Sequence, residues 1–153
     1  MKKVLLLYGL LVLVLLILYF VKSGATDFLI KKNAVLSING NKIILERADS
    51  EKERMIGLTQ KTGLTDDQGM IFIFPTKGKY SFWTKNMKFP IDIIFLNDNK
   101  VMDIFKDVPP ANSDINIPTV TSQEQTNYVI ELSSGNADKN NIKLGDQLTI
   151  ENL

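Results

Sequence analysis

Residues 81–98 read SFWTKNMKFPIDIIFLND and bring the chain's only tryptophan, Trp83, close to a strongly apolar run that contains one carboxylate. Successive side chains of a strand point to opposite faces, so Ile91 and Ile93 share one face and Asp92 lies on the other. An unpaired buried carboxylate is costly in free energy. The position of Asp92 therefore predicts that a cation, backbone donors or water lie next to it.

Glu131 repeats this pattern within the apolar run YVIEL. The candidate cations for the two acids are Arg54, Lys61 and Lys85. In one interpretation the acids form ion pairs that specify the fold, and Asp92 is neutralised by Arg54 or Lys85. In another they line a single polar pocket, and in a third they lie on exposed strand edges.

Local patterns around this stretch predict further elements. Two apolar runs flank Asn39-Gly40, a pair typical of a tight hairpin turn because both residues accept positive φ. Ser50 and Glu53 have the spacing of a capping box, which predicts a short helix beginning near residue 51. The run MIFIF predicts a strand that ends at Pro75.

IDIIFL and KVMDIF form a second predicted hairpin, and YVIEL and DQLTI are later strands. The polar segment Pro109–Asn127 is predicted as a long loop and as the variable binding face of the domain. The sequence thus predicts a mainly β (α+β) domain over residues 35–153. We expect about eight short strands and one or two short helices, arranged as a compact curled sheet or partial barrel.

The N-terminal segment indicates where the chain resides. Val4–Val21 carries no charge, and as a helix it would extend about 27 Å, close to the thickness of a bilayer's hydrocarbon core. With Lys2 and Lys3 before it, the positive-inside rule predicts a cytoplasmic N-terminus, a single-pass membrane anchor over residues 1–25 and an extracytoplasmic domain. The alternative is a signal sequence cleaved near Ala25, which would give a secreted protein. Residues 26–34 are the expected linker.

Composition excludes several functions. The chain has no histidine and no cysteine, which removes Ser-His-Asp catalysis, the usual zinc sites and disulfides. We expect neither a metal nor a cofactor. Leaving out Lys2, Lys3 and Lys22, the 18 basic residues fall to 15 against 17 acidic ones, a net charge of about −2. Such a balance does not fit a nucleic-acid partner.

Five motifs in order, ERMIGL, GMIFIF, FWTKN with FPIDIIFLND, YVIELSSG and LGD, make residues 54–150 similar to the domain of unknown function 192 family. The resemblance implies a compact β-rich barrel-like α+β domain, membrane-anchored or exported, with no assigned activity. The chain departs from the family pattern at Lys61, where arginine is usual, at Thr84, where methionine is usual, and at Met87, where threonine is usual. The positions that match the family pattern are Arg54, Gly57, Leu58, Gly69, Met70, Phe72, Phe82, Trp83, Lys85, Asn86, Pro90, Asp92, Glu131, Gly135 and Gly145.

Two functions stay open. The first is a non-catalytic envelope module that binds a small ligand, a glycan or an envelope protein. Its N-terminal helix would also insert into the membrane. The second is an enzyme acting on envelope carbohydrate, with Asp92 and Glu131 as acid and base, which requires the two carboxyls about 5–10 Å apart across an open cleft. The candidate binding residues are Arg54, Trp83, Lys85, Asn86, Asp92 and Glu131.

Two of these candidates have a second interpretation. Trp83 either fills the core or forms a stacking platform at the rim of a cleft. Lys85 and Asn86 either form a turn, with the asparagine in the left-handed region, or present an ammonium and an amide to an anionic ligand.

Overall fold

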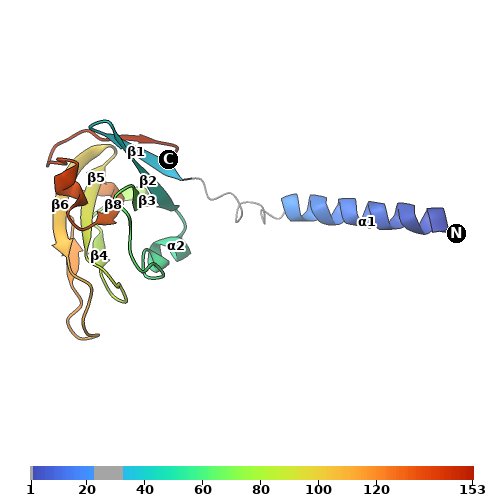
Figure 1. The fold of residues 1–153 in the computed structure, drawn as a ribbon, viewed down its shortest axis with the longest axis horizontal. Helices are drawn as coiled ribbons and strands as arrows, with labels where there is room; N and C mark the ends of the chain where they lie inside the picture. The colour runs from blue at the N-terminus through green and yellow to red at the C-terminus, as the bar shows by residue number, and fades with distance from the viewer. Residues whose placement is uncertain (1, 23–32) are drawn as a thin grey trace. The chain divides into compact units, whose positions relative to one another are not determined.

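The structure, a computed structural model, describes residues 2–22 and 33–153, and within the first range the side chains of residues 8–19. The chain divides into two units, Met1–Lys31 and Lys32–Leu153. The first contains α1 (Lys2–Lys22) (Figure 1). Within the described part of the chain, no helix reaches the length and apolarity needed to cross a membrane. The predicted cleavage site near Ala25 and most of the predicted linker lie outside the described residues.

The second unit is mainly β, with a curled half-barrel sheet of seven strands and few short helices. The sheet strands follow the order β6-β5-β8-β3-β2-β1-β9, and those from β6 to β1 are labelled in Figure 1. In a separate two-stranded sheet, β4 pairs with β7. In residues 33–153 the elements are β1 (Ala34–Ile38), β2 (Asn41–Ala48), α2 (Glu51–Ile56), β3 (Gln68–Gly78), β4 (Ser81–Trp83), β5 (Ile91–Asn97), β6 (Lys100–Val108), β7 (Thr119–Thr121), β8 (Thr126–Ser133), α3 (Asn136–Lys139) and β9 (Thr149–Glu151).

One strand pair differs from the rest of the large sheet. β2 and β3 run parallel, and α2 lies in the connection between them. The other neighbours in this sheet are antiparallel. A parallel pair needs a crossover connection rather than a tight turn. The segment between β2 and β3, which contains α2, provides this crossover and is therefore long.

The predicted hairpin turn and helix start agree with the structure, whereas the predicted end of one strand at a proline does not. Asn39 and Gly40 have φ of 49° and 80° and join β1 to β2, as predicted. The capping box of Ser50 and Glu53 is present at the start of α2. The prediction that Pro75 ends its strand is wrong, because β3 continues to residue 78. Proline has no backbone N–H to donate, but the ladder to β8 is interrupted after Ile73, so the extended chain passes through Pro75 without losing a hydrogen bond there.

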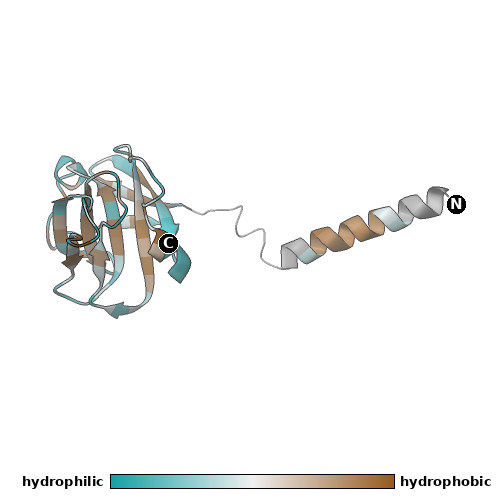
Figure 2. Ribbon diagram, turned by 90° about the horizontal axis from the view of Figure 1, so that it is seen from below, coloured by the Kyte–Doolittle hydropathy of each residue, from teal (hydrophilic) through white to brown (hydrophobic). Residues whose placement is uncertain are grey.

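The sheet separates two apolar clusters. One face carries Ile71, Ile94 and Ile130, and the other carries Phe72, Phe95 and Val129, all fully or almost fully buried. Figure 2 shows the apolar residues concentrated along the strands. Because side chains alternate along each strand, the face of any residue on β3, β5 or β8 follows from the register.

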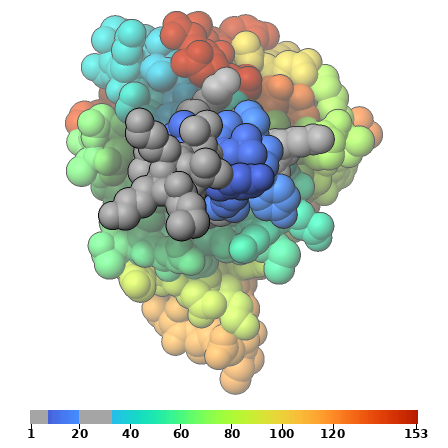
Figure 3. Space-filling view, turned by 90° about the vertical axis from the view of Figure 1, so that its right-hand side faces the viewer, coloured from blue at the N-terminus to red at the C-terminus, as the bar shows by residue number. Residues whose placement is uncertain are grey.

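The long loop predicted over Pro109–Asn127 is only partly correct. The segment contains β7, and β8 already begins at Thr126. What remains without strand or helix is mainly residues 109–118, which project at the lower end of the domain (Figures 1 and 3). β7 pairs with β4 through backbone hydrogen bonds. Each of these strands is three residues long, too short for a sequence pattern to predict the pairing.

Candidate functional site

A cavity of about 240 Å³ lies between α2 with the turn that follows it, β3, and β4 with its neighbours. Its wall is largely aromatic and apolar. The central strand β8 contributes one residue to this wall, the acid Glu131. The lining residues are Glu51, Arg54, Met55, Ile56, Gly57, Leu58, Thr59, Phe72, Phe74, Tyr80, Ser81, Phe82, Trp83, Met87 and Glu131. Seven of them, Arg54, Gly57, Leu58, Phe72, Phe82, Trp83 and Glu131, are positions that carry the family resemblance.

The register of the sheet places Glu131 at this cavity. It lies directly opposite Met70 of β3 and Ile93 of β5. Residues opposite each other in a ladder share a face, so the Glu131 side chain shares its face with the buried cluster that also contains Phe72. The acid is therefore surrounded on its own sheet by apolar side chains, with the cavity above it.

Glu131 is 4% exposed. Among the described residues its carboxyl has no hydrogen bond or ion pair, and its oxygens still reach the surface of the cavity. Removal from water without a compensating partner disfavours the ionised form. Burial accordingly raises the pKa of Glu131 from 4.5 to about 8. At neutral pH the carboxyl is mostly protonated and has both a donor and an acceptor available.

The prediction that a cation from Arg54 or Lys85 neutralises Asp92 is wrong. Asp92 is 0% exposed, and its two oxygens accept hydrogen bonds from the backbone N–H groups of Asp107 and Ala137, each at 2.9 Å. Backbone donors on β6 and α3 satisfy the acid, so it joins these elements to β5. Asp92 is thus a structural residue outside the cavity.

The two acids do not form a pair. Ile93 is the residue opposite Glu131, and Asp92, its neighbour, points to the other face of the sheet. The proposed use of Asp92 and Glu131 as acid and base across one cleft is therefore wrong. A two-carboxylate glycosidase needs both groups in one cleft, where they flank the glycosidic bond that is cleaved.

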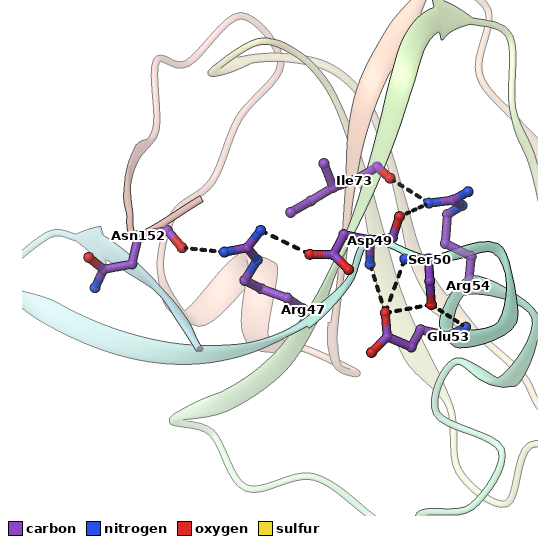
Figure 4. A network of polar contacts seen from close by, with 7 residues as sticks. All are labelled: Arg47, Asp49, Ser50, Glu53, Arg54, Ile73 and Asn152. Carbon is purple, nitrogen blue, oxygen red and sulfur yellow. Dashed lines mark hydrogen bonds and ion pairs between the residues drawn. The ribbon is translucent and has the colours of Figure 1, made fainter. Parts of the chain in front are cut away.

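Arg54 lies in the wall of the cavity, held by α2. Its Nη1 donates to the carbonyl oxygens of Asp49 and Ile73, at 2.5 and 2.9 Å, and its guanidinium carbon lies 5.2 Å from the centre of the Phe74 ring. Figure 4 shows these bonds beside the capping box of the helix. The arginine connects α2 to β3 through backbone carbonyls, and neither of these two hydrogen bonds goes to a carboxylate.

Trp83 does not fill the core, because 57% of it is exposed. It lies at the rim of the cavity, as the platform interpretation predicted, while its neighbour Phe82 is buried. Phe82 packs edge-on against Phe72 with ring centres 4.9 Å apart, and Phe74 stacks on Tyr80 at 3.6 Å. These contacts fix the aromatic wall before any ligand arrives.

Lys85 and Asn86 do not line the cavity. Asn86 has φ of 60°, as the turn interpretation predicted, and Lys85 lies 3.3 Å from Asp114 in an exposed ion pair. Lys61, the third candidate cation, forms an ion pair with Glu46. The three residues therefore contribute to local structure and surface charge.

Sequence reasoning missed Met55, Phe74 and Tyr80 as parts of the cavity. Met55 is 72% exposed although apolar, and lies at the rim. Gly57, which follows α2, has φ of 50°, and a Cβ there would lie 3.4 Å from the Phe72 ring. The positive φ is what favours glycine at this turn, since a Cβ at that distance from the ring would make only an ordinary van der Waals contact. Met55, an apolar residue in an otherwise strongly charged predicted helix, is the one sequence signal that could have indicated this surface.

The described residues contain no group of three or more acidic, histidine or cysteine side chains that could hold a metal ion. The polar groups on the cavity wall suit hydrogen bonding and ion pairing. The fold and the site thus define a small half-barrel domain with an aromatic pocket. The buried carboxyl of Glu131 lies at the inner end of that pocket.

The chain belongs to the domain of unknown function 192 (DUF192) family, described as an uncharacterized ACR, whose model matches residues 34–150. No curated protein matches the chain.

Two solved structures are similar. One is a protein of unknown function from Novosphingobium aromaticivorans DSM 12444, with 28% identity and a TM-score of 0.65, covering 76% of this chain and 83% of that chain. The other is described as a putative transcription regulator from Sinorhizobium meliloti 1021, with 25% identity and a TM-score of 0.68, covering 79% of this chain and 94% of that chain.

Proposed function

We propose that this domain is a non-catalytic binding module that takes a small organic ligand in the aromatic pocket above Glu131. The observation that carries the proposal is a carboxyl that is 4% exposed, has no partner among the described residues and faces a cavity. Buried polar groups are almost always hydrogen-bonded. A ligand that reaches Glu131 would supply the missing bond.

The size and lining of the pocket support a small molecule over a glycan or a protein segment. A cavity of about 150 Å³ with apolar walls is large enough to bind benzene, and this one measures about 240 Å³. It has room for one ring with a short substituent. Ligand sites are typically concave and apolar with few polar groups, as here.

Trp83 provides the test, because it is the only tryptophan and lies at the rim. Titration of the full-length protein with small aromatic compounds should change its fluorescence with a saturating profile. Amide shifts in an NMR titration should concentrate in α2 and β4 and spare residues 109–118. The Lys85→Ala variant, altered outside the cavity, should bind like the parent. Shifts confined to residues 109–118 would reject the pocket as the site.

We also propose that residues 4–21 anchor the protein in the cell membrane and that the domain lies outside the cytoplasm. The uncharged run and the preceding Lys2 and Lys3 support this proposal. Protease added to intact cells should remove the domain and leave a membrane-bound N-terminal fragment. Recovery of a soluble chain that begins at Thr26 would instead establish cleavage and secretion.

A further inference from the structure

We propose that the ligand of this pocket is a small organic amine whose ammonium group binds the Glu131 carboxyl while its apolar body packs on the surrounding aromatic rings. This inference rests on the function proposed above and specifies the chemical class of the ligand.

The two buried acids of the sheet differ in how their charge is satisfied. Asp92 receives two backbone N–H groups, whereas no donor among the described residues reaches the Glu131 carboxyl. A cation bound at Glu131 would supply charge and hydrogen-bond donors together. A neutral ligand would supply at most the hydrogen bond, and an anion would be repelled once the acid ionises.

The wall of the pocket also suits a cation. Phe72, Phe74, Tyr80, Phe82 and Trp83 line it. The faces of aromatic rings attract ammonium groups, and the attraction increases when the groups are shielded from water. Phe74 already stacks on Tyr80 and lies under Arg54, so the other rings of the wall are the ones available to a ligand. Together with the acid they provide two favourable interactions for one ammonium.

The remaining charged and titratable groups do not replace this cation. Glu51 and Arg54 lie on α2 and Tyr80 lies before β4, while β3 and β5 place Met70 and Ile93 opposite Glu131. Arg54 donates to two backbone carbonyls and lies over Phe74, with no ion pair to Glu131. Glu51 and Arg54 carry opposite charges on the same helix, so together they add no net charge to the wall. The charge of the preferred ligand therefore depends on Glu131 of β8.

Binding of the amine is expected to release a proton. The free carboxyl, with a pKa of about 8, is mostly protonated at pH 7. When the ammonium binds, the O–H bond of Glu131 breaks, the proton passes to solvent and the carboxylate pairs with the ammonium. Calorimetry at pH 7 in buffers of different ionisation enthalpy should give about 0.9 protons released per ligand.

The test uses the full-length protein with 2-phenylethylamine, the neutral 2-phenylethanol and the anionic 3-phenylpropionate. From pH 6 to pH 8 the ionised fraction of Glu131 rises from about 1% to about one half, so the affinity for the amine should rise about 50-fold. The affinity for the alcohol should change less than twofold. The anion should bind most weakly.

Variants assign the effect to one acid. Glu131→Gln should lose the pH dependence and bind the amine no better than the alcohol. Glu124→Gln, the same change at an exposed acid, should behave like the parent. Thermal melts confirm that each variant is folded.

The outcomes separate the two proposals. Equal affinity for alcohol and amine at pH 8, tighter binding of the anion, or a pH dependence that survives in Glu131→Gln would overturn the amine inference while the pocket remains a binding site. If none of the three probes binds, both proposals fail.

Discussion

Replacement of Glu131 by glutamine should make the stability of the protein less sensitive to pH. The pKa of this acid is raised by burial to about 8 from 4.5. A group whose pKa is higher in the folded state stabilises the fold fully below pH 4.5 and loses that contribution as the pH rises through 8. Each pKa unit corresponds to about 1.4 kcal/mol, so the loss is about 3 kcal/mol at pH 7 and about 5 kcal/mol above pH 8.

Glu131→Gln keeps the shape of the protonated acid and cannot ionise. The free energies of unfolding of parent and variant, from urea titrations followed by circular dichroism, should therefore be similar at pH 4. At pH 7 the variant should be more stable by about 3 kcal/mol, or roughly 10 °C in Tm. The other titratable groups are shared, so the difference between the two proteins isolates this acid. Parallel stability profiles from pH 4 to pH 9 would refute the assignment of a raised pKa to Glu131.

Three further substitutions test the framework around the site, each by urea unfolding. Asp92→Asn should cost about 3 kcal/mol, since the amide cannot accept from both backbone N–H groups now bound; unchanged stability would mean that those donors find other acceptors. Gly69→Ala should cost about 2 kcal/mol, because the new methyl group would lie 2.7 Å from the Glu131 carbonyl oxygen, whereas Gly63→Ala, with nothing within 4 Å, serves as the comparison. Ser50→Ala should cost about 1 kcal/mol by removing the cap of α2, and Ser50→Asp should restore most of it.

The elements that sequence predicts well are those specified by neighbouring residues. Asn39-Gly40 requires a positive φ at both positions, and Ser50 with Glu53 satisfies the first N–H groups of a helix, so hairpin and helix follow from a few residues. Sequence wrongly predicts that the strand ends at Pro75, because the missing N–H of proline matters only where the strand is hydrogen-bonded to its neighbour. The pairing of β3 with β8 is interrupted at that point.

The site depends on relations that a single sequence does not contain. Alternation gives the face of Asp92 within β5 and of Glu131 within β8, but only the pairing of Ile93 with Glu131 relates the two strands. That pairing places the two acids on opposite faces. The partners of Arg54 are backbone carbonyls, which every residue has, so no side-chain pattern could indicate them.

The order of the strands determines when the pocket can exist during synthesis. β8 lies between β3 and β5, although the ribosome makes it after both. Until residue 133 has emerged, those two strands each present an open edge with unpaired backbone groups to other chains. The acid of the pocket lies on this late strand. Nascent chains that stop before β8 would therefore both lack the site and be prone to aggregate, and a ligand could stabilise only chains that have completed the sheet.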